Sequence, residues 1–104
     1  MWSGRFVVLA LAFGLMAVPA HAETIQIAIE NLAFAPTEVS AKVGDTIEWV
    51  NKDALAHTAT ATNNDWAVNI ALRQSGSVVL KKPGAVDYFC KFHPNMKGRI
   101  VVAP

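Results

Sequence analysis

Short segments in which apolar and polar residues alternate are the feature that most restricts how this chain can fold. In residues 23–30 (ETIQIAIE), Ile25, Ile27 and Ile29 fall on one face, which is typical of a half-buried β-strand. We expect further strands over residues 37–43, 46–51, 57–62, 77–81, 86–90 and 98–102, with 66–72 either strand or irregular. Turn-forming or loop segments separate them, at 31–36, 44–45, 74–77, 83–84 and 91–95. No segment has a convincing helical period, so the pattern predicts an all-β sandwich or barrel.

The first 22 residues have a different character. Arg5 is the only charged residue before Glu23, and the apolar run over residues 6–18 ends in Pro-Ala-His-Ala. A positive start, an apolar middle and an Ala-x-Ala site are typical of a secretory signal peptide. An uncleaved membrane anchor is the alternative, but a spanning helix needs about 20 apolar residues. We therefore expect residues 1–22 to be a signal peptide, and residues 23–104 to be one periplasmic domain with no membrane span.

Removing this leader changes what the composition implies. The remaining 82 residues lack Arg5, so they carry eight of the nine basic side chains against eight acidic ones. Domains that bind nucleic acid normally have a basic surface, so we expect no nucleic-acid partner. One cysteine excludes an intramolecular disulfide framework and a Cys-x-x-Cys redox motif. The soft or imidazole metal ligands left in this chain are His57, Cys90, His93 and Met96.

Three of these four residues lie within seven positions, as Cys90-x-x-His93-x-x-Met96, and His57 lies 33 positions before the cysteine. Taken singly, a cysteine or methionine of this kind is usually packed in a core, and a loop histidine is usually solvated. Their clustering favours a shared metal. Two imidazoles and a thiolate with a weak axial thioether form a blue-copper site. Zinc is the alternative, but a structural zinc ion normally takes a fourth cysteine or histidine.

The sequence resembles the cupredoxins, and among them the amicyanins. The matching residues are 43–51 (VGDTIEWVN), His57, Tyr88-Phe89-Cys90 and His93-Pro94-x-Met96-x-Gly98, within a similarity that runs from about residue 33 to 102. The very short Cys-x-x-His-x-x-Met loop is the most specific element, because plastocyanins and pseudoazurins have a longer gap between histidine and methionine. The resemblance implies a Greek-key β-sandwich of about seven to eight strands.

The same resemblance implies a function. One type 1 copper ion, held by His57, Cys90, His93 and Met96, would cycle between Cu(I) and Cu(II), and the protein would carry single electrons without acting as an enzyme. Its redox partners, such as a periplasmic dehydrogenase and a c-type cytochrome, would dock on a monomer at the apolar surface around His93. That surface would be formed by Phe92, Pro94, Leu55 and Ala56.

Two residues depart from the amicyanin pattern. Phe92 stands where amicyanins usually have proline, and Thr58 stands where an asparagine helps to tie the ligand loops together. Lys91, Lys97 and Arg99 place positive charge near the ligand loop, which either steers an acidic partner or forms a solvated rim. A periplasmic copper chaperone or storage protein is the main functional alternative, and a small β-sandwich interaction module whose ligand-type residues are accidental is a third.

Overall fold

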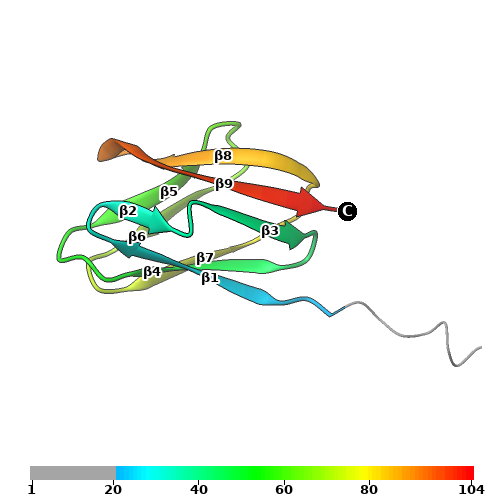
Figure 1. Cartoon of the computed structure of the whole chain (residues 1–104), viewed down its shortest axis with the longest axis horizontal. Coiled ribbons are helices and arrows are strands. Elements are labelled where there is room, and N and C mark those ends of the chain that lie inside the picture. The colour runs from blue at the N-terminus through cyan, green and yellow to red at the C-terminus, as the bar shows by residue number, and fades with distance from the viewer. Residues whose placement is uncertain (1–20) are drawn as a thin grey trace, which may run out of the picture.

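Two β-sheets face each other in the computed structural model, which describes residues 21–104 (Figure 1). A layer of apolar side chains fills the space between them. The strands in this range are β1 (Thr24–Glu30), β2 (Ala33–Ala35), β3 (Glu38–Lys42), β4 (Thr46–Asn51), β5 (His57–Ala61), β6 (Ala67–Ile70), β7 (Ser75–Val79), β8 (Gly84–Cys90) and β9 (His93–Ala103). One sheet has the order β2-β1-β4-β7, and the other has the order β3-β9-β8-β5-β6. The described residues contain no helix, so the all-β sandwich predicted from the alternating pattern is confirmed.

The alternating residues form the core as expected. Strand β1 runs parallel to β4, with Ile27 directly beside Trp49, and both side chains are fully buried. From the opposite sheet, Tyr88 reaches the same layer, and its hydroxyl accepts a hydrogen bond of 3.3 Å from Trp49 Nε1. Trp66, at 5.4 Å between ring centroids from Trp49, packs against this layer from the edge of the sandwich. The core therefore joins the two sheets through a group of aromatic rings.

The structure differs from the sequence-based expectation at two places in the first sheet. Residues 33–35 were expected in a loop but form the short strand β2, because the chain reverses at Asn31 and Leu32 (φ 55° and 60°) and pairs Phe34 with Ile29. Strand β7 begins at Ser75, whereas the sequence placed a turn there. Its polar residues pair with β4 through the backbone, so apolar alternation does not reveal them.

Four turns meet at one end of the sandwich, on the left of Figure 1: β1–β2, β4–β5, β6–β7 and β8–β9. Asp53 in the β4–β5 loop accepts a hydrogen bond from the N–H of Leu32 in the β1–β2 turn, at 3.1 Å. Asn51 donates from its side chain to the carbonyl of Ala71, after β6, at 3.2 Å. The described chain begins and ends at the opposite end of the sandwich (Figure 1).

Residues 21–104 include no helix of the length and apolar character that a membrane crossing requires. Residues 1–20, which make up most of the expected signal peptide, lie outside the described residues.

Candidate metal centre

Three of the four predicted ligands come together at the end of the sandwich where the four turns meet. His57 is the first residue of β5, Cys90 is the last of β8, and His93 is the first of β9. The Cys90 Sγ atom lies 3.7 Å from Nδ1 of His57 and 3.8 Å from Nδ1 of His93. The three donor atoms lie within 4.8 Å of one another. His57 and Cys90 are buried and His93 is half-buried, so the group opens to the surface on the His93 side.

The turn between β8 and β9 brings Cys90 and His93 together. Residues 91–95 were predicted as a loop, but β9 already begins at His93, and only Lys91 and Phe92 connect the two strands. Cys90 is paired with His93 across the ladder, after a register shift between Phe89 and Cys90. A bulge of this kind redirects side chains at the end of a sheet. The short spacing in the sequence thus corresponds to a hairpin tip rather than to an open loop.

Thr58 ties this tip to strand β5. Its backbone N–H donates to Cys90 Sγ at 3.3 Å, and its Oγ1 accepts a hydrogen bond of 2.9 Å from the Lys91 N–H. The resemblance assigned a tying role to an asparagine at this position. The threonine provides a connection between the same two segments with its hydroxyl group and its backbone.

Met96 lies three residues beyond His93 on β9. Its side chain is buried in the core cluster that also contains Cys90. It also lines the same surface hollow as His93. The fold therefore places Met96 in the same region of the molecule as the other three donors.

Asp53 is a residue of this site that the sequence reasoning missed. Its Oδ2 atom lies 2.9 Å from Nε2 of His57, the ring nitrogen that faces away from Cys90. The same carboxylate accepts the N–H groups of Asn31 at 2.8 Å and Leu32 at 3.1 Å. Burial opposes ionisation of Asp53, but hydrogen bonds from Leu32, His57 and Asn31 outweigh it, so its pKa lies below the usual range. The signal in the sequence that could have identified Asp53 is its place four residues before His57.

Two of the donor separations fit a metal ion held between the sulfur and the imidazole nitrogens. Bonds of about 2.0 Å to nitrogen and about 2.3 Å to sulfur that meet at about 120° separate the two donor atoms by about 3.7 Å. The Sγ–Nδ1 separations of 3.7 and 3.8 Å match this spacing. Asp53 also supplies the carboxylate that a ligating histidine commonly bonds through its second nitrogen. One thiol, two imidazoles and a nearby thioether are a donor set suited to copper.

We expect Asp53→Ala to weaken copper binding by about 10- to 100-fold, because His57 loses the partner that fixes its ring orientation. Titration against a competing copper chelator measures this change. Asp65→Ala is the matched control, since Asp65 is also a loop carboxylate, pairs with Lys82 at 3.3 Å and lies far from the site. An affinity for copper that is the same in Asp53→Ala, Asp65→Ala and the unchanged protein would contradict the role assigned to Asp53.

An apolar hollow surrounds the exposed side of this group. Its volume is about 400 Å³, and its lining comprises Leu32, Phe92, His93, Pro94, Asn95 and Met96. Phe92 is 60% exposed and Leu32 is 46% exposed, so two large apolar side chains face solvent beside His93. Phe92 and Pro94 were expected here from the sequence, whereas Leu32 was not, because the β1–β2 turn that carries it is distant in sequence.

The positive charge expected near the ligand loop is partly engaged elsewhere. Arg99 Nε lies 2.9 Å from Asp87 Oδ1, so its charge is paired on the outer face of the sheet.

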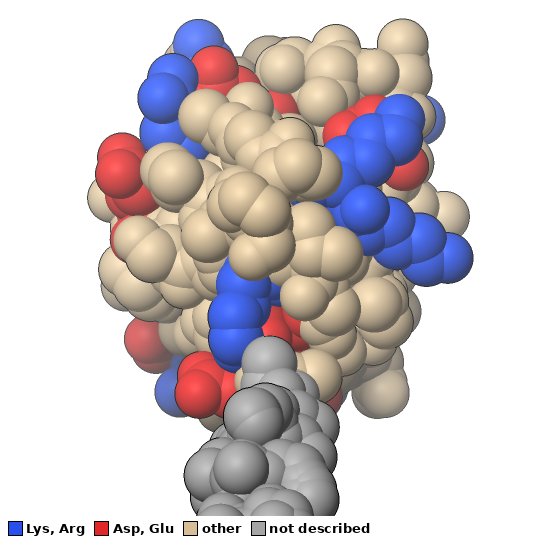
Figure 2. Space-filling model, turned by 90° about the vertical axis from the view of Figure 1, so that its right-hand side faces the viewer, with Lys and Arg blue, Asp and Glu red and all other residues tan. Residues whose placement is uncertain are grey.

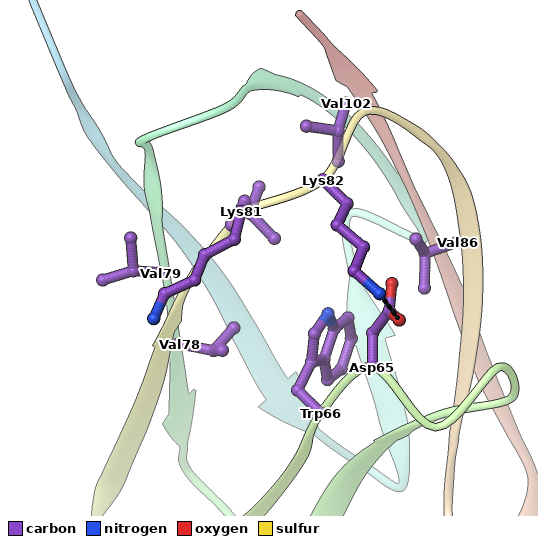
Figure 3. A pocket seen from close by; sticks show the side chains of 9 residues that line it. Asp65, Trp66, Val78, Val79, Lys81, Lys82, Val86 and Val102 are labelled. Carbon is purple, nitrogen blue, oxygen red and sulfur yellow. Dashed lines mark hydrogen bonds and ion pairs between the residues drawn. The ribbon is translucent and has the colours of Figure 1, made fainter.

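A second groove, of about 240 Å³, lies away from the ligands, between the ends of β7 and β8 (Figure 3). Trp66 and several valines line it, and Lys82 crosses it to reach Asp65 (Figure 3). None of its lining residues belongs to the donor group, so this groove is not the metal centre.

Comparison with known proteins gives consistent matches. A family model described as "Cupredoxin-like domain" matches residues 5–102. Amicyanin from Paracoccus versutus is 30% identical over 78% of this chain, and the matched segment spans 66% of that protein's length. Methylamine utilization protein MauL from Methylorubrum extorquens is 31% identical over 95% of this chain and 92% of its own. The crystal structure of Paracoccus versutus amicyanin superposes with a TM-score of 0.66 at 31% identity, over 84% of this chain and 86% of that one.

Proposed function

Because the chain belongs to the cupredoxin-like family, we propose that it is a blue-copper electron carrier that works in the periplasm. The observation that carries this proposal is the convergence of one thiol and two imidazole nitrogens at the end of the sandwich. We assign His57, Cys90, His93 and Met96 as the ligands of a single copper ion. Copper bound by such a donor set takes up and releases one electron between its Cu(II) and Cu(I) states.

The residues around the donors keep them in place. His57 and Cys90 lie at strand ends inside the core, and hydrogen bonds from Thr58 and to Asp53 fix the sulfur and the imidazole. These side chains therefore need to move little when a bound metal ion gains or loses one electron. The N–H of Thr58 also directs a partial positive charge at the sulfur, and hydrogen bonding of this kind tunes the reduction potential.

His93 is the donor nearest to solvent, and it provides the route between the site and a partner. When another protein docks there, the apolar rim formed by Leu32 and Phe92 excludes water from the contact. The distance between His93 and the partner's redox centre is then shorter. We propose that this protein transforms no substrate, because enzymes with several copper ions need more than the two histidines available after residue 22.

The leader and the relatives support a location and a class of partner. Residues 1–22 have the composition of a signal peptide, and we propose that cleavage after Ala22 releases residues 23–104 into the periplasm. The similarity to a methylamine utilization protein favours an amine-oxidising dehydrogenase as electron donor, with a c-type cytochrome as acceptor.

The proposed function is tested with the copper-loaded protein, residues 23–104. We expect an intense blue absorption, with a narrow copper hyperfine splitting, that disappears and returns in a reversible one-electron redox titration. A chaperone or storage protein would instead release Cu(I) readily to a competing metal-free binding protein. A colourless Cu(II) adduct would contradict the proposal, and so would rapid loss of Cu(I) to the competitor.

We expect Phe92→Glu to slow electron self-exchange between oxidised and reduced copies by at least about tenfold, because two carboxylates then meet across the contact. NMR line broadening in mixtures of the two oxidation states measures the rate. Val79→Glu is the control, because Val79 is 48% exposed at the opposite end of the sandwich. Equal rates in the two variants would show that electrons do not pass through the surface beside His93.

A further inference from the structure

The carboxylate of Asp45 is buried at the end of the sandwich opposite to the metal centre. The sequence suggested a simple turn residue here, yet only 2% of Asp45 is exposed. Its Oδ2 accepts the backbone N–H of Lys42 at 2.9 Å, and its Oδ1 lies 3.2 Å from Lys42 Nζ. Oδ1 also accepts the backbone N–H of Glu23, at 2.9 Å. The third donor comes from a residue 22 positions earlier in the chain.

The nitrogen of Glu23 is held in this position by the sheet. The Glu23 carbonyl accepts the Thr46 N–H at 2.8 Å, and strand β1 starts at the next residue and pairs with β4. Asp45 itself comes directly before β4, so the two parallel strands bring the carboxylate and the Glu23 nitrogen together. Figure 2 views this end of the molecule, where basic and acidic side chains lie beside the start of the described chain.

We propose that Asp45 is the receptor for the α-ammonium group that removal of the signal peptide creates at Glu23. The proposal rests on the cleavage after Ala22 proposed above. A signal peptidase adds water across the Ala22–Glu23 peptide bond, so that the hydroxyl group joins the Ala22 carbonyl carbon and a proton joins the Glu23 nitrogen. At neutral pH that nitrogen takes up one more proton. A neutral amide N–H facing Asp45 is thereby replaced by a cation in the same place.

Replacing the amide N–H of Glu23 by an ammonium group stabilises the buried carboxylate of Asp45. Removing a charged group from water is unfavourable unless it is paired and hydrogen-bonded. Before cleavage, Lys42 is the cation in contact with Asp45, and the Lys42 side chain is 38% exposed. A charge-assisted hydrogen bond is roughly twice as strong as a neutral one. Hydrogen bonds from the Glu23 and Lys42 backbones already hold the pKa of Asp45 below its usual range, so the carboxylate is ionised when the cation forms.

Among the described residues that line the position of this ammonium group, Lys42 is the other cation, and its Nζ lies 3.2 Å from Oδ1, the oxygen that also accepts the Glu23 N–H. The shallow hollow around it is lined by Ile25, Ser40, Ala41 and Ala103, together with Glu23, Lys42 and Asp45. The charged side chains in this lining are therefore Glu23, which is exposed, Lys42 and Asp45. Cleavage thus leaves the folded domain more stable than it is with the leader attached, and processing and folding favour each other.

The test compares two forms of the copper-loaded 23–104 chain, one with a free α-amino group and one with that group acetylated. Acetylation keeps an N–H donor at Glu23 but removes the charge. We expect it to raise the equilibrium constant for unfolding in denaturant on the order of tenfold at neutral pH. In Asp45→Asn, the same acetylation is expected to change this constant by less than about twofold, because the two groups act as a pair.

Three further measurements make the result decisive. Intact mass of the exported protein must give a chain that starts at Glu23, and a different start overturns the proposal. Asp87→Asn is the control, since this exposed carboxylate pairs with Arg99 and must leave the acetylation effect unchanged. If Asp45→Asn does not fold, Lys42→Gln replaces it, and the acetylation effect must then increase, because the ammonium group is the remaining cation. An equal effect of acetylation in all folded variants overturns the proposal.

Discussion

Cys90→Ser is expected to abolish the blue absorption of the copper-loaded protein completely. The colour requires charge transfer from a thiolate to Cu(II), and a hydroxyl group at this position supplies no such donor. Cys90 is the one cysteine of the chain, so no other thiolate replaces it. The imidazoles of His57 and His93 remain, and the variant is expected to bind copper weakly and without colour. Visible absorption and the copper hyperfine splitting measure the change.

The fold of Cys90→Ser has to be checked separately from its colour. Serine is close to cysteine in shape, and the Thr58 N–H that donates to Cys90 Sγ can donate to its oxygen. Circular dichroism of the metal-free variant is therefore expected to match that of the metal-free parent. Thr58→Ser is the matched control, since it keeps both the backbone N–H and the hydroxyl group beside the sulfur and is expected to stay blue. Intense blue absorption retained in Cys90→Ser would show that this thiol is not a ligand.

Gly98→Ala is expected to give the largest loss of stability, of about 1–3 kcal/mol or more. Gly98 lies opposite Tyr88 in the β8–β9 ladder, and the Tyr88 ring covers the glycine. A methyl group at Gly98 would meet Tyr88 Cζ, with the hydroxyl oxygen at 2.5 Å and Cε1 at 2.7 Å. The ring cannot move away freely, because it packs between Phe34 and Trp49 and is fully buried. Chemical denaturation of the two proteins measures the loss.

Gly76→Ala is the matched control, because Gly76 also lies in a strand opposite an aromatic residue, Trp49. Its added methyl group would meet Val68 Cγ1 at 2.8 Å, Ile70 Cγ1 at 3.1 Å and the carbonyl oxygen of Asn69 at 3.2 Å, so this variant also loses stability but leaves the Tyr88 ring in place. The phenol of Tyr88 offers a second readout, since burial raises its pKa to about 12. Tyr88 is the one tyrosine of the chain, so ultraviolet absorption follows its ionisation directly. Displacement of the ring in Gly98→Ala lowers this pKa toward 10, and an unchanged pKa together with unchanged stability would contradict the prediction.

The sequence predicted the fold wherever the apolar alternation of a strand was regular. In β4 every second side chain is buried, and in β1 Ile27 and Ile29 are buried and Ile25 is half-buried, so burial follows the pattern. The pattern failed where backbone pairing alone makes a strand. The hairpin to β2 depends on left-handed backbone angles at Asn31 and Leu32, and the polar start of β7 depends on its pairing with β4.

The proposed ligand residues could be identified from the sequence because three of them are close together in the chain. The structure brings His57, Cys90 and His93 into one group, as the hypothesis required. The supporting contacts were not accessible, because they join segments that only the folded chain brings together. Asp53 links the β4–β5 loop to the turn at Leu32. Asp45 links the β3–β4 turn to Glu23 in the same way.

The position of the chain ends has a practical consequence for attaching this protein to a surface. The described chain begins and ends at one end of the sandwich (Figure 1). The strand ends that carry His57, Cys90 and His93 lie at the other. A tether added after Pro104 therefore presents His93 outward, toward a soluble partner, when the protein is fixed to a bead or an electrode. A tether added before Glu23 gives the same orientation but blocks the α-amino group that faces Asp45. Immobilisation through the C-terminus is for this reason the arrangement that keeps both ends of the molecule as they are in solution.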